Sequence, residues 1–183
     1  MRQVTGAAMT SEAYIQYELK SELRNEFING QLFEMPGEKD INNRIALMIA
    51  VILLRQLQLK DGYQVYNHDV KVGIPGGRKF YYPDVFVTAE PRMPENQYIK
   101  YSPQIIVEVV SESSQTHDYV NKYLDYIQFP TLQYYLIAEP ETTLVTVYER
   151  SGEEWVARKY TRLEDDILIP GLDIQLPMAE IYC

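Results

Sequence analysis

The sequence predicts an α/β protein in which a mixed β-sheet is flanked by helices. Segments with helical spacing of apolar residues alternate along the chain with short runs rich in β-branched and aromatic residues. The chain has 183 residues, of which 46% are hydrophobic, and this is enough to build one core of ordinary size. No linker, internal repeat or low-complexity tract interrupts it. We therefore expect a single domain over residues 1–183.

The N-terminal part is predicted to form a helix followed by a β-hairpin. The helix is expected over residues 10–24, which start with a Thr-Ser pair that could cap it and continue with tyrosine and leucine at roughly helical spacing. Asn29-Gly30 then separates two short apolar runs, 26–28 and 31–33. This dipeptide most readily takes the two positive φ angles of a tight hairpin turn.

The rest of the chain is predicted to contain two helices and six strands. A long, mostly buried helix is expected over residues 40–60, which hold many Ile, Leu and Met residues and neither Gly nor Pro. An amphipathic helix is expected at 115–129, ended by Pro130. Strands are expected at 64–74, 79–88, 104–110, 132–138, 144–149 and 155–160, before a tail punctuated by Pro and Gly.

Charge and cysteine content restrict the class of protein. The net charge is −9 and the pI is about 4.8, whereas nucleic-acid-binding domains usually carry a basic surface. A metal-dependent nuclease is still compatible with this balance, because it needs clustered carboxylates and a bound cation reverses the local field. The one cysteine, Cys183, excludes a disulfide framework, and we find no secretory signal and no apolar run long enough for a membrane span. We expect a cytoplasmic protein.

Two acids inside apolar strands indicate a functional site. Glu108 lies within residues 105–110, all otherwise apolar, and an unpaired charge there would cost several kcal/mol. Asp84 lies in a similar run at 80–87, where Pro83 predicts a kink or bulge that redirects the side chain. The alternatives for Glu108 are an ion pair with an arginine or an edge strand facing water. Together the two acids would suffice to bind Mg²⁺ or Mn²⁺, which accept oxygen ligands.

A lysine on the next helix adds a third candidate. Asp118 and Lys122 are four residues apart and therefore share a helix face. The alternative is an ordinary surface ion pair between them, which is common and contributes little stability. The two histidines, His68 and His117, are given no role, because a lone loop histidine is more often a solvated group.

These residues resemble a known nuclease signature. Tyr82-Pro83-Asp84, followed by Glu108 in an apolar strand and then by a lysine, is similar to the PD-(D/E)xK pattern. A longer series of segments resembles, in order and spacing, the Uma-type restriction endonuclease family of that superfamily. The matching segments are residues 26–32, 83–85, 107–111, 118–123 and 134–137, and the resemblance runs from about Tyr14 to Tyr182.

The resemblance implies a restriction-endonuclease-like core and metal-dependent hydrolysis of phosphodiester bonds in DNA. Asp84 and Glu108 would be catalytic and would hold Mg²⁺ or Mn²⁺, while Lys122 would orient the attacking water or stabilise negative charge. Glu26 is a possible additional acid, and its alternative is an exposed residue at a strand end.

The chain departs from the family pattern in two places. Val110 stands where the signature has its lysine, so the resemblance makes Lys122 a migrated substitute. Asn42 and Asn43 stand at the start of the long helix, where family members often carry a histidine.

Other functions and partners stay open from the sequence. Basic residues that could contact DNA are few, namely Lys39, Arg44, Lys71, Arg78 and Lys79. The first alternative is a non-catalytic binding or scaffolding module that retains the nuclease fold. The acidic balance and the missing lysine at Val110 favour it. A second is an acidic interaction protein whose sixteen tyrosines line a partner surface. A homodimer is expected if both strands of a duplex are cut symmetrically.

Overall fold

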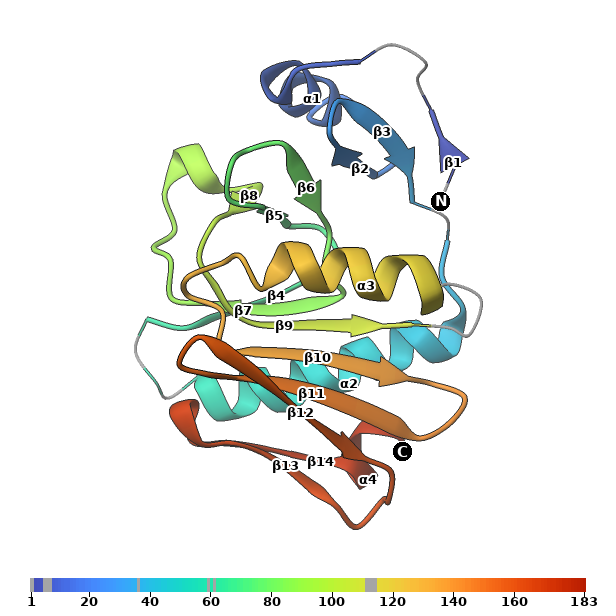
Figure 1. Ribbon diagram of the computed structural model, residues 1–183, viewed down its shortest axis with the longest axis vertical. Coiled ribbons are helices and arrows are strands. Elements are labelled where there is room, and N and C mark those ends of the chain that lie inside the picture. The colour runs from blue at the N-terminus through green and yellow to red at the C-terminus, as the bar shows by residue number, and fades with distance from the viewer. Residues whose placement is uncertain (1, 5–7, 36, 59, 61, 111–114) are drawn as a thin grey trace.

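The computed structural model describes residues 2–4, 8–35, 37–58, 60, 62–110 and 115–183, with the backbone alone at 2, 96 and 115–119 (Figure 1). Its helices are α1 (Ser11–Glu18), α2 (Asp40–Leu57), α3 (Gln115–Tyr126) and α4 (Met178–Ile181), with the 3-10 helices η1 (Pro94–Asn96) and η2 (Pro170–Leu172). Its strands are β1 (Arg2–Gln3), β2 (Asn25–Ile28), β3 (Gln31–Glu34), β4 (Gln64–Asn67), β5 (Lys71–Gly73), β6 (Lys79–Tyr81), β7 (Val85–Thr88), β8 (Ile99–Lys100), β9 (Pro103–Val109), β10 (Tyr134–Glu139), β11 (Leu144–Ser151), β12 (Glu154–Tyr160), β13 (Asp166–Ile169) and β14 (Ile174–Pro177).

The strands form two larger sheets and one hairpin. The main sheet has the order β12-β11-β10-β9-β7-β4, and the second sheet has the order β1-β3-β2-β6-β5-β8. Strands β9 and β10 pair in parallel and are joined through α3, whereas β9 pairs antiparallel with β7. Because β9 has a neighbour on each side, Glu108 does not lie on an edge strand.

Helices α2 and α3 cover opposite faces of the main sheet (Figure 1). Successive side chains of a strand point to opposite faces, and this alternation separates two buried clusters. The cluster under α2 contains Val85, Val87, Ile105, Val107, Val109, Leu136 and Ala138. The cluster on the side of α3 contains Phe86, Ile106, Tyr135, Ile137 and the α3 residue Tyr126. Glu108 stands between Val107 and Val109, so its side chain points to the face that α3 covers.

The predicted N-terminal hairpin is confirmed. Asn29 and Gly30 take φ angles of 49° and 91°, and β2 pairs with β3 across them. The predicted first helix forms with Thr10 as its cap, but it ends at Glu18 because Leu19 to Arg24 turn back toward β2. Of the apolar residues expected on this helix, only Tyr14 reaches the core, where its ring stacks on Phe27 at 4.9 Å between centroids.

The two long strands predicted at 64–74 and 79–88 are each divided. The first breaks at His68, whose φ of 49° is left-handed and cannot continue a strand. The second breaks at 82–84, where Pro83 lacks the N–H that a strand would need. The chain therefore leaves the second sheet after β6 and enters the main sheet at β7. At Pro83, where a kink was expected, the chain passes from one sheet to the other.

The remaining elements agree with the prediction, except at the C-terminus. Helices α2 and α3 and strands β9 to β12 occupy the expected segments, with ends shifted by a few residues. The predicted irregular tail instead forms the β13-β14 hairpin and α4, both packed against α2. Alternating apolar residues Ile167, Ile169, Ile174 and Leu176 supply its buried face. No helix in the described ranges combines the length and the apolar composition needed to cross a bilayer.

The hairpin turn yields a stability prediction. Gly30→Ala places a Cβ at a φ of 91° and 3.3 Å from the Cβ of Ala8. A side chain in this left-handed conformation costs about 1–2 kcal/mol, and we expect the free energy of unfolding in urea to fall by about that amount. Gly37→Ala is the matched control, because Gly37 has no positive φ and nothing within 4 Å of its Cβ position. Equal losses in both variants would contradict the proposed turn constraint.

Candidate metal and nuclease site

Four separate elements bring three buried carboxylates and one lysine together. Glu26 belongs to β2, Asp84 directly precedes β7, Glu108 lies in β9 and Lys122 lies in α3. The three acids are only 1%, 5% and 5% exposed, in that order. The structure thus assembles all four residues named from the sequence. Their catalytic and metal-binding roles remain predictions.

Lys122 lies between two of these acids. Its Nζ is 3.1 Å from Oε1 of Glu26 and 3.3 Å from Oε1 of Glu108. Its side chain is 12% exposed and its Nζ lies 5.5 Å from the centre of the Tyr81 ring. Burial alone would lower the pKa of Lys122, but the carboxylates of Glu108, Glu26 and Asp84 raise it well above its ordinary value. Lys122 is therefore a buried cation, and the side chain of Asp118 lies outside the described residues.

Glu108 is held by two donors from α3. Tyr126 donates its hydroxyl to Oε1 at 2.6 Å, and Lys122 donates to Oε1 and Oε2 at 3.3 and 3.4 Å. Burial raises the pKa of Glu108, and Lys122 and Tyr126 partly offset this by stabilising the carboxylate. Glu108 therefore has an ion-pair partner, as one of the alternatives to a metal site required, but the partner is a lysine and not an arginine. Tyr126 was not identified as a site residue, because its spacing on α3 resembles that of a core residue.

Asp84 faces a different set of groups. Its Oδ2 accepts a hydrogen bond of 2.6 Å from the backbone N–H of Val109, and its Oδ1 lies 3.6 Å from Nδ1 of His68. Burial raises the pKa of Asp84 well above its usual range, and the charges of Glu108 and Glu38 add to the effect. A carboxylate with so few compensating donors favours either a proton or a cation.

Glu26 is the fourth member and is buried, so the alternative of an exposed strand end is wrong. Its Oε1 forms an ion pair with Nζ of Lys122 at 3.1 Å and accepts a hydrogen bond of 3.5 Å from the backbone N–H of Tyr82. Its Oε2 is buried and has no hydrogen-bond partner among the described residues. A buried carboxylate oxygen without a donor is costly unless a cation or water completes it. The donor set of this site is therefore compatible with a hard divalent ion.

The polar side of α3 is buried instead of solvated. Besides Lys122, Asp125 is only 4% exposed and accepts from Nζ of Lys79 at 2.6 and 2.8 Å. The Tyr81 hydroxyl donates to the same carboxylate at 2.7 Å. The exposed apolar residues among the described side chains of α3 are Val120 and Leu124, at 58% and 51%, whereas Tyr126 is fully buried. Helical spacing in the sequence separates the polar and aromatic sides of α3 but does not indicate that both are buried.

Among the described residues, Asp84 also forms a group of three possible metal ligands with Glu38 and His68. Glu38, His68 and Asp84 each offer a ligand atom, and these atoms lie within 4.8 Å of one another. Glu38 lies just before α2 and His68 just after β4. Neither residue was singled out from the sequence, since both stand in loops whose approach to Asp84 depends on the fold.

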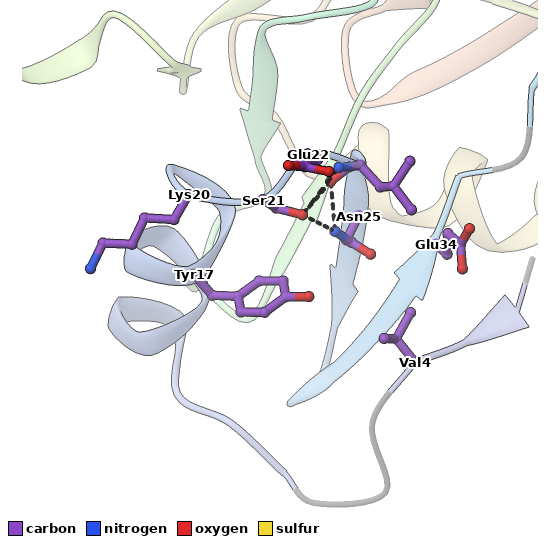
Figure 2. Close-up of a pocket in the computed structure, with 8 residues that line it drawn as sticks. Val4, Tyr17, Lys20, Ser21, Glu22, Asn25 and Glu34 are labelled. Atoms are coloured by element: carbon purple, nitrogen blue, oxygen red, sulfur yellow. Dashed lines mark hydrogen bonds between the residues drawn. The ribbon is translucent and has the colours of Figure 1, made fainter.

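A hollow of about 390 Å³ lies elsewhere, between α1 and the N-terminal strands (Figure 2). Tyr17 and Leu23 line it, and Asn25 at its floor donates to Ser21 and to the Leu23 carbonyl. None of the four clustered residues lines this hollow. We place the candidate chemistry at the carboxylate cluster and not here, because a reaction centre needs convergent ionisable groups.

The buried lysine leads to a stability prediction. Lys122→Met leaves Glu26 and Glu108 buried without the ammonium, and such a loss usually costs about 3–5 kcal/mol. We expect chemical denaturation of the metal-free protein to show a fall of this size. The matched control, Lys159→Met, removes an exposed lysine of β12 and should change stability by less than about 0.5 kcal/mol.

A second substitution tests whether the cost is electrostatic. In the double variant Lys122→Met/Glu108→Gln, one of the two stranded charges is gone, so we expect part of the lost stability to return. Strictly additive costs for the two substitutions would show that Lys122 stabilises the protein by packing alone.

Comparisons with known proteins agree with this architecture. The family model described as "Uma2: Putative restriction endonuclease" matches residues 11–179. Two uncharacterized proteins of Synechocystis sp. are similar: slr1290 is 26% identical over 176 residues, covering 95% of this chain and 91% of the relative. The second, sll1609, is 30% identical over 156 residues, covering 83% of this chain and 87% of the relative.

A solved structure shares the fold. It is a crystal structure from Anabaena variabilis ATCC 29413, described as "a putative nuclease belonging to DUF820". It aligns with a TM-score of 0.76 at 15% identity and covers 95% of this chain and 97% of that one. The predicted mixed α/β architecture is thereby confirmed. Since the family model spans nearly the whole sequence, the chain belongs to the Uma2 family.

Proposed function

We propose that this protein is a metal-dependent endonuclease that hydrolyses phosphodiester bonds in DNA. The observation that carries the proposal is the convergence of Asp84, Glu108 and Lys122, together with Glu26, in one buried cluster. Isolated buried acids are usually paired or coordinate metals. Here Glu26 and Glu108 share the ammonium of Lys122, while Asp84 forms no ion pair with a lysine or arginine among the described residues. Membership of a family described as restriction endonucleases supports DNA as the substrate.

Asp84 and Glu108 would hold a divalent ion such as Mg²⁺ or Mn²⁺. Glu108 lies in β9, and Asp84 directly precedes the adjacent strand β7. Oε2 of Glu26 offers a further buried oxygen that has no donor among the described residues. When bound, such an ion supplies a Lewis acid for the scissile phosphate and lowers the pKa of bound water. The N–H of Val109 fixes the Asp84 carboxylate, while Tyr126 fixes that of Glu108.

Lys122 would stabilise the negative charge that develops on the phosphate or orient the attacking water. Val110, where the signature has its lysine, follows β9 directly, yet Nζ of Lys122 reaches Glu108 from α3. The acidic balance and the absence of a lysine at Val110 were the two features favouring a non-catalytic module. Because an ammonium reaches the cluster from α3, the second of these features no longer argues against catalysis.

DNA would have to approach an acidic protein with few free basic groups. Of the candidates named from the sequence, Lys71 is 4% exposed, and Lys79 and Lys39 are ion-paired with Asp125 and Glu141. Arg44 is exposed on α2, and Arg78 is exposed in the β5-β6 turn. A small number of phosphate contacts predicts weak DNA affinity with a shallow dependence on salt concentration.

The proposal is tested by metal binding and DNA cleavage on the same samples. We expect the wild-type protein to bind Mn²⁺ in calorimetry and to nick plasmid DNA when Mn²⁺ or Mg²⁺ is added. Asp84→Asn and Glu108→Gln should lose metal affinity, and cleavage should fall at least about a hundredfold. Asp166→Asn, which changes an exposed acid of β13, is the matched control and should retain both properties.

Two outcomes would separate the possibilities. Cleavage that persists in Asp84→Asn and Glu108→Gln would contradict the proposal and point to a contaminating nuclease. An absence of cleavage on supercoiled, linear and single-stranded DNA with all samples folded would favour the non-catalytic module.

A further inference from the structure

His68 lies beside Asp84, the acid of the proposed nuclease site that has no lysine or arginine as a partner. Among the described residues, no lysine or arginine forms an ion pair with Asp84 or with Glu38. The group that faces Oδ1 of Asp84 is the imidazole of His68, whose side chain is 14% exposed. Asp84 thus has a different neighbourhood from Glu26 and Glu108, which share Lys122.

The backbone fixes this neighbourhood. Strands β4 and β7 pair so that Asn67 lies opposite Val85, which places the next residue of one strand beside the preceding residue of the other. The N–H of His68 donates to the carbonyl of Asp84 at 3.3 Å. The carbonyl of His68 accepts a hydrogen bond of 3.3 Å from the guanidinium of Arg24. The imidazole is therefore carried to Asp84 by the register of the main sheet and not by a free loop.

The distances between the ligand atoms of Glu38, His68 and Asp84 suit a shared metal ion, whereas the distance from His68 to Asp84 does not suit a hydrogen bond. Nδ1 of His68 is 3.6 Å from Oδ1 of Asp84, too far for a hydrogen bond between them. The ligand atoms of Glu38, His68 and Asp84 all lie within 4.8 Å of one another. Ions with bond lengths of roughly 2.0–2.4 Å hold their ligands no more than about 4–5 Å apart, so one ion can reach all three.

Charge gives the same answer. Glu38 and Asp84 place two carboxylates within 4.8 Å of each other beside His68. A divalent cation bound to all three residues would offset the two like charges.

We infer that Glu38, His68 and Asp84 form a mixed nitrogen and oxygen site for a divalent transition metal, with Mn²⁺ or Zn²⁺ bound in preference to Mg²⁺. Imidazole nitrogen suits transition ions, whereas Mg²⁺ selects oxygen ligands and retains its waters. The inference deepens the proposed function, on which it rests for its catalytic meaning, because Asp84 belongs to both. It identifies the ion and adds two ligands.

The test uses the full chain and reads ligation directly. Mn²⁺ is added to the wild-type protein, and its affinity is measured by calorimetry in parallel with Mg²⁺ and Zn²⁺. Electron spin-echo spectra of the Mn²⁺ sample should show modulation from a directly bound ¹⁴N nucleus. Mn²⁺ and Zn²⁺ should bind at least about tenfold more tightly than Mg²⁺.

His68→Asn is the informative variant, since asparagine tolerates the left-handed φ of 49° that position 68 adopts and has no imidazole. We expect its affinity for Mn²⁺ to fall at least about tenfold and the ¹⁴N modulation to vanish. Glu38→Gln should weaken Mn²⁺ binding while the modulation persists. His117→Asn, which changes the other histidine of the chain, is the matched control and should behave as wild type.

Each remaining outcome decides between the two proposals. Mn²⁺ bound without ¹⁴N modulation, or equal affinities for Mn²⁺ and Mg²⁺, would overturn the inference and leave the carboxylate site of the proposed nuclease intact. Modulation lost in His117→Asn instead of His68→Asn would overturn the assignment to His68. Nitrogen-bound Mn²⁺ with no DNA cleavage would uphold the inference and contradict the proposed function.

Discussion

The buried ammonium of Lys122 is the interaction on which the rest of this site depends. It joins α3 to Glu26 of the second sheet and to Glu108 of the main sheet, at 3.1 and 3.3 Å. Neither acid has another cation within ion-pairing distance among the described residues. Removing one partner of a buried pair leaves an uncompensated charge, so the position of α3 and the approach of the two sheets are coupled electrostatically.

The position of the site follows from the alternation of one strand and the break in another. Val107 and Val109 face α2, so Glu108 faces α3 and meets Tyr126 and Lys122 there. At Pro83 the chain leaves the second sheet, and the following Asp84 arrives next to the end of β9. An acid that follows a forced change of sheet is fixed by backbone geometry, as the hydrogen bond from Val109 shows.

The sequence predicts those parts of the molecule that local rules control. Asn29 and Gly30 specify their hairpin through two positive φ angles, and the apolar neighbours of Glu108 specify a buried strand. Local rules do not predict which residue supplies the opposite charge. Glu26 and Lys122 lie on β2 and α3, far apart in the chain, and no pattern within either segment predicts that the two side chains meet.

The positions of His68 and Lys71 were not predicted either, because they too depend on contacts between distant elements. His68 breaks a strand through a left-handed φ that histidine adopts only occasionally, so the run from 64 to 74 reads as continuous. Lys71 looks like a solvated cation beside a turn. In the fold it is buried, with Nζ 3.1 Å from the Tyr82 hydroxyl and 5.0 Å from the centre of the Tyr82 ring. In each case the deciding partner comes from another element.

The charge balance of the cluster links folding to the proposed chemistry. Glu26, Asp84 and Glu108 against Lys122 leave two negative charges in excess if all are ionised. Without a metal, burial raises the pKa of both Asp84 and Glu108, neighbouring carboxylates add to the effect, and the protonated forms are favoured. A divalent cation would supply the two missing charges and favour the ionised forms of Asp84 and Glu108. The same burial that makes the metal-free cluster costly therefore creates the driving force for binding an ion, which is the arrangement expected of a functional site rather than of a core selected for stability alone.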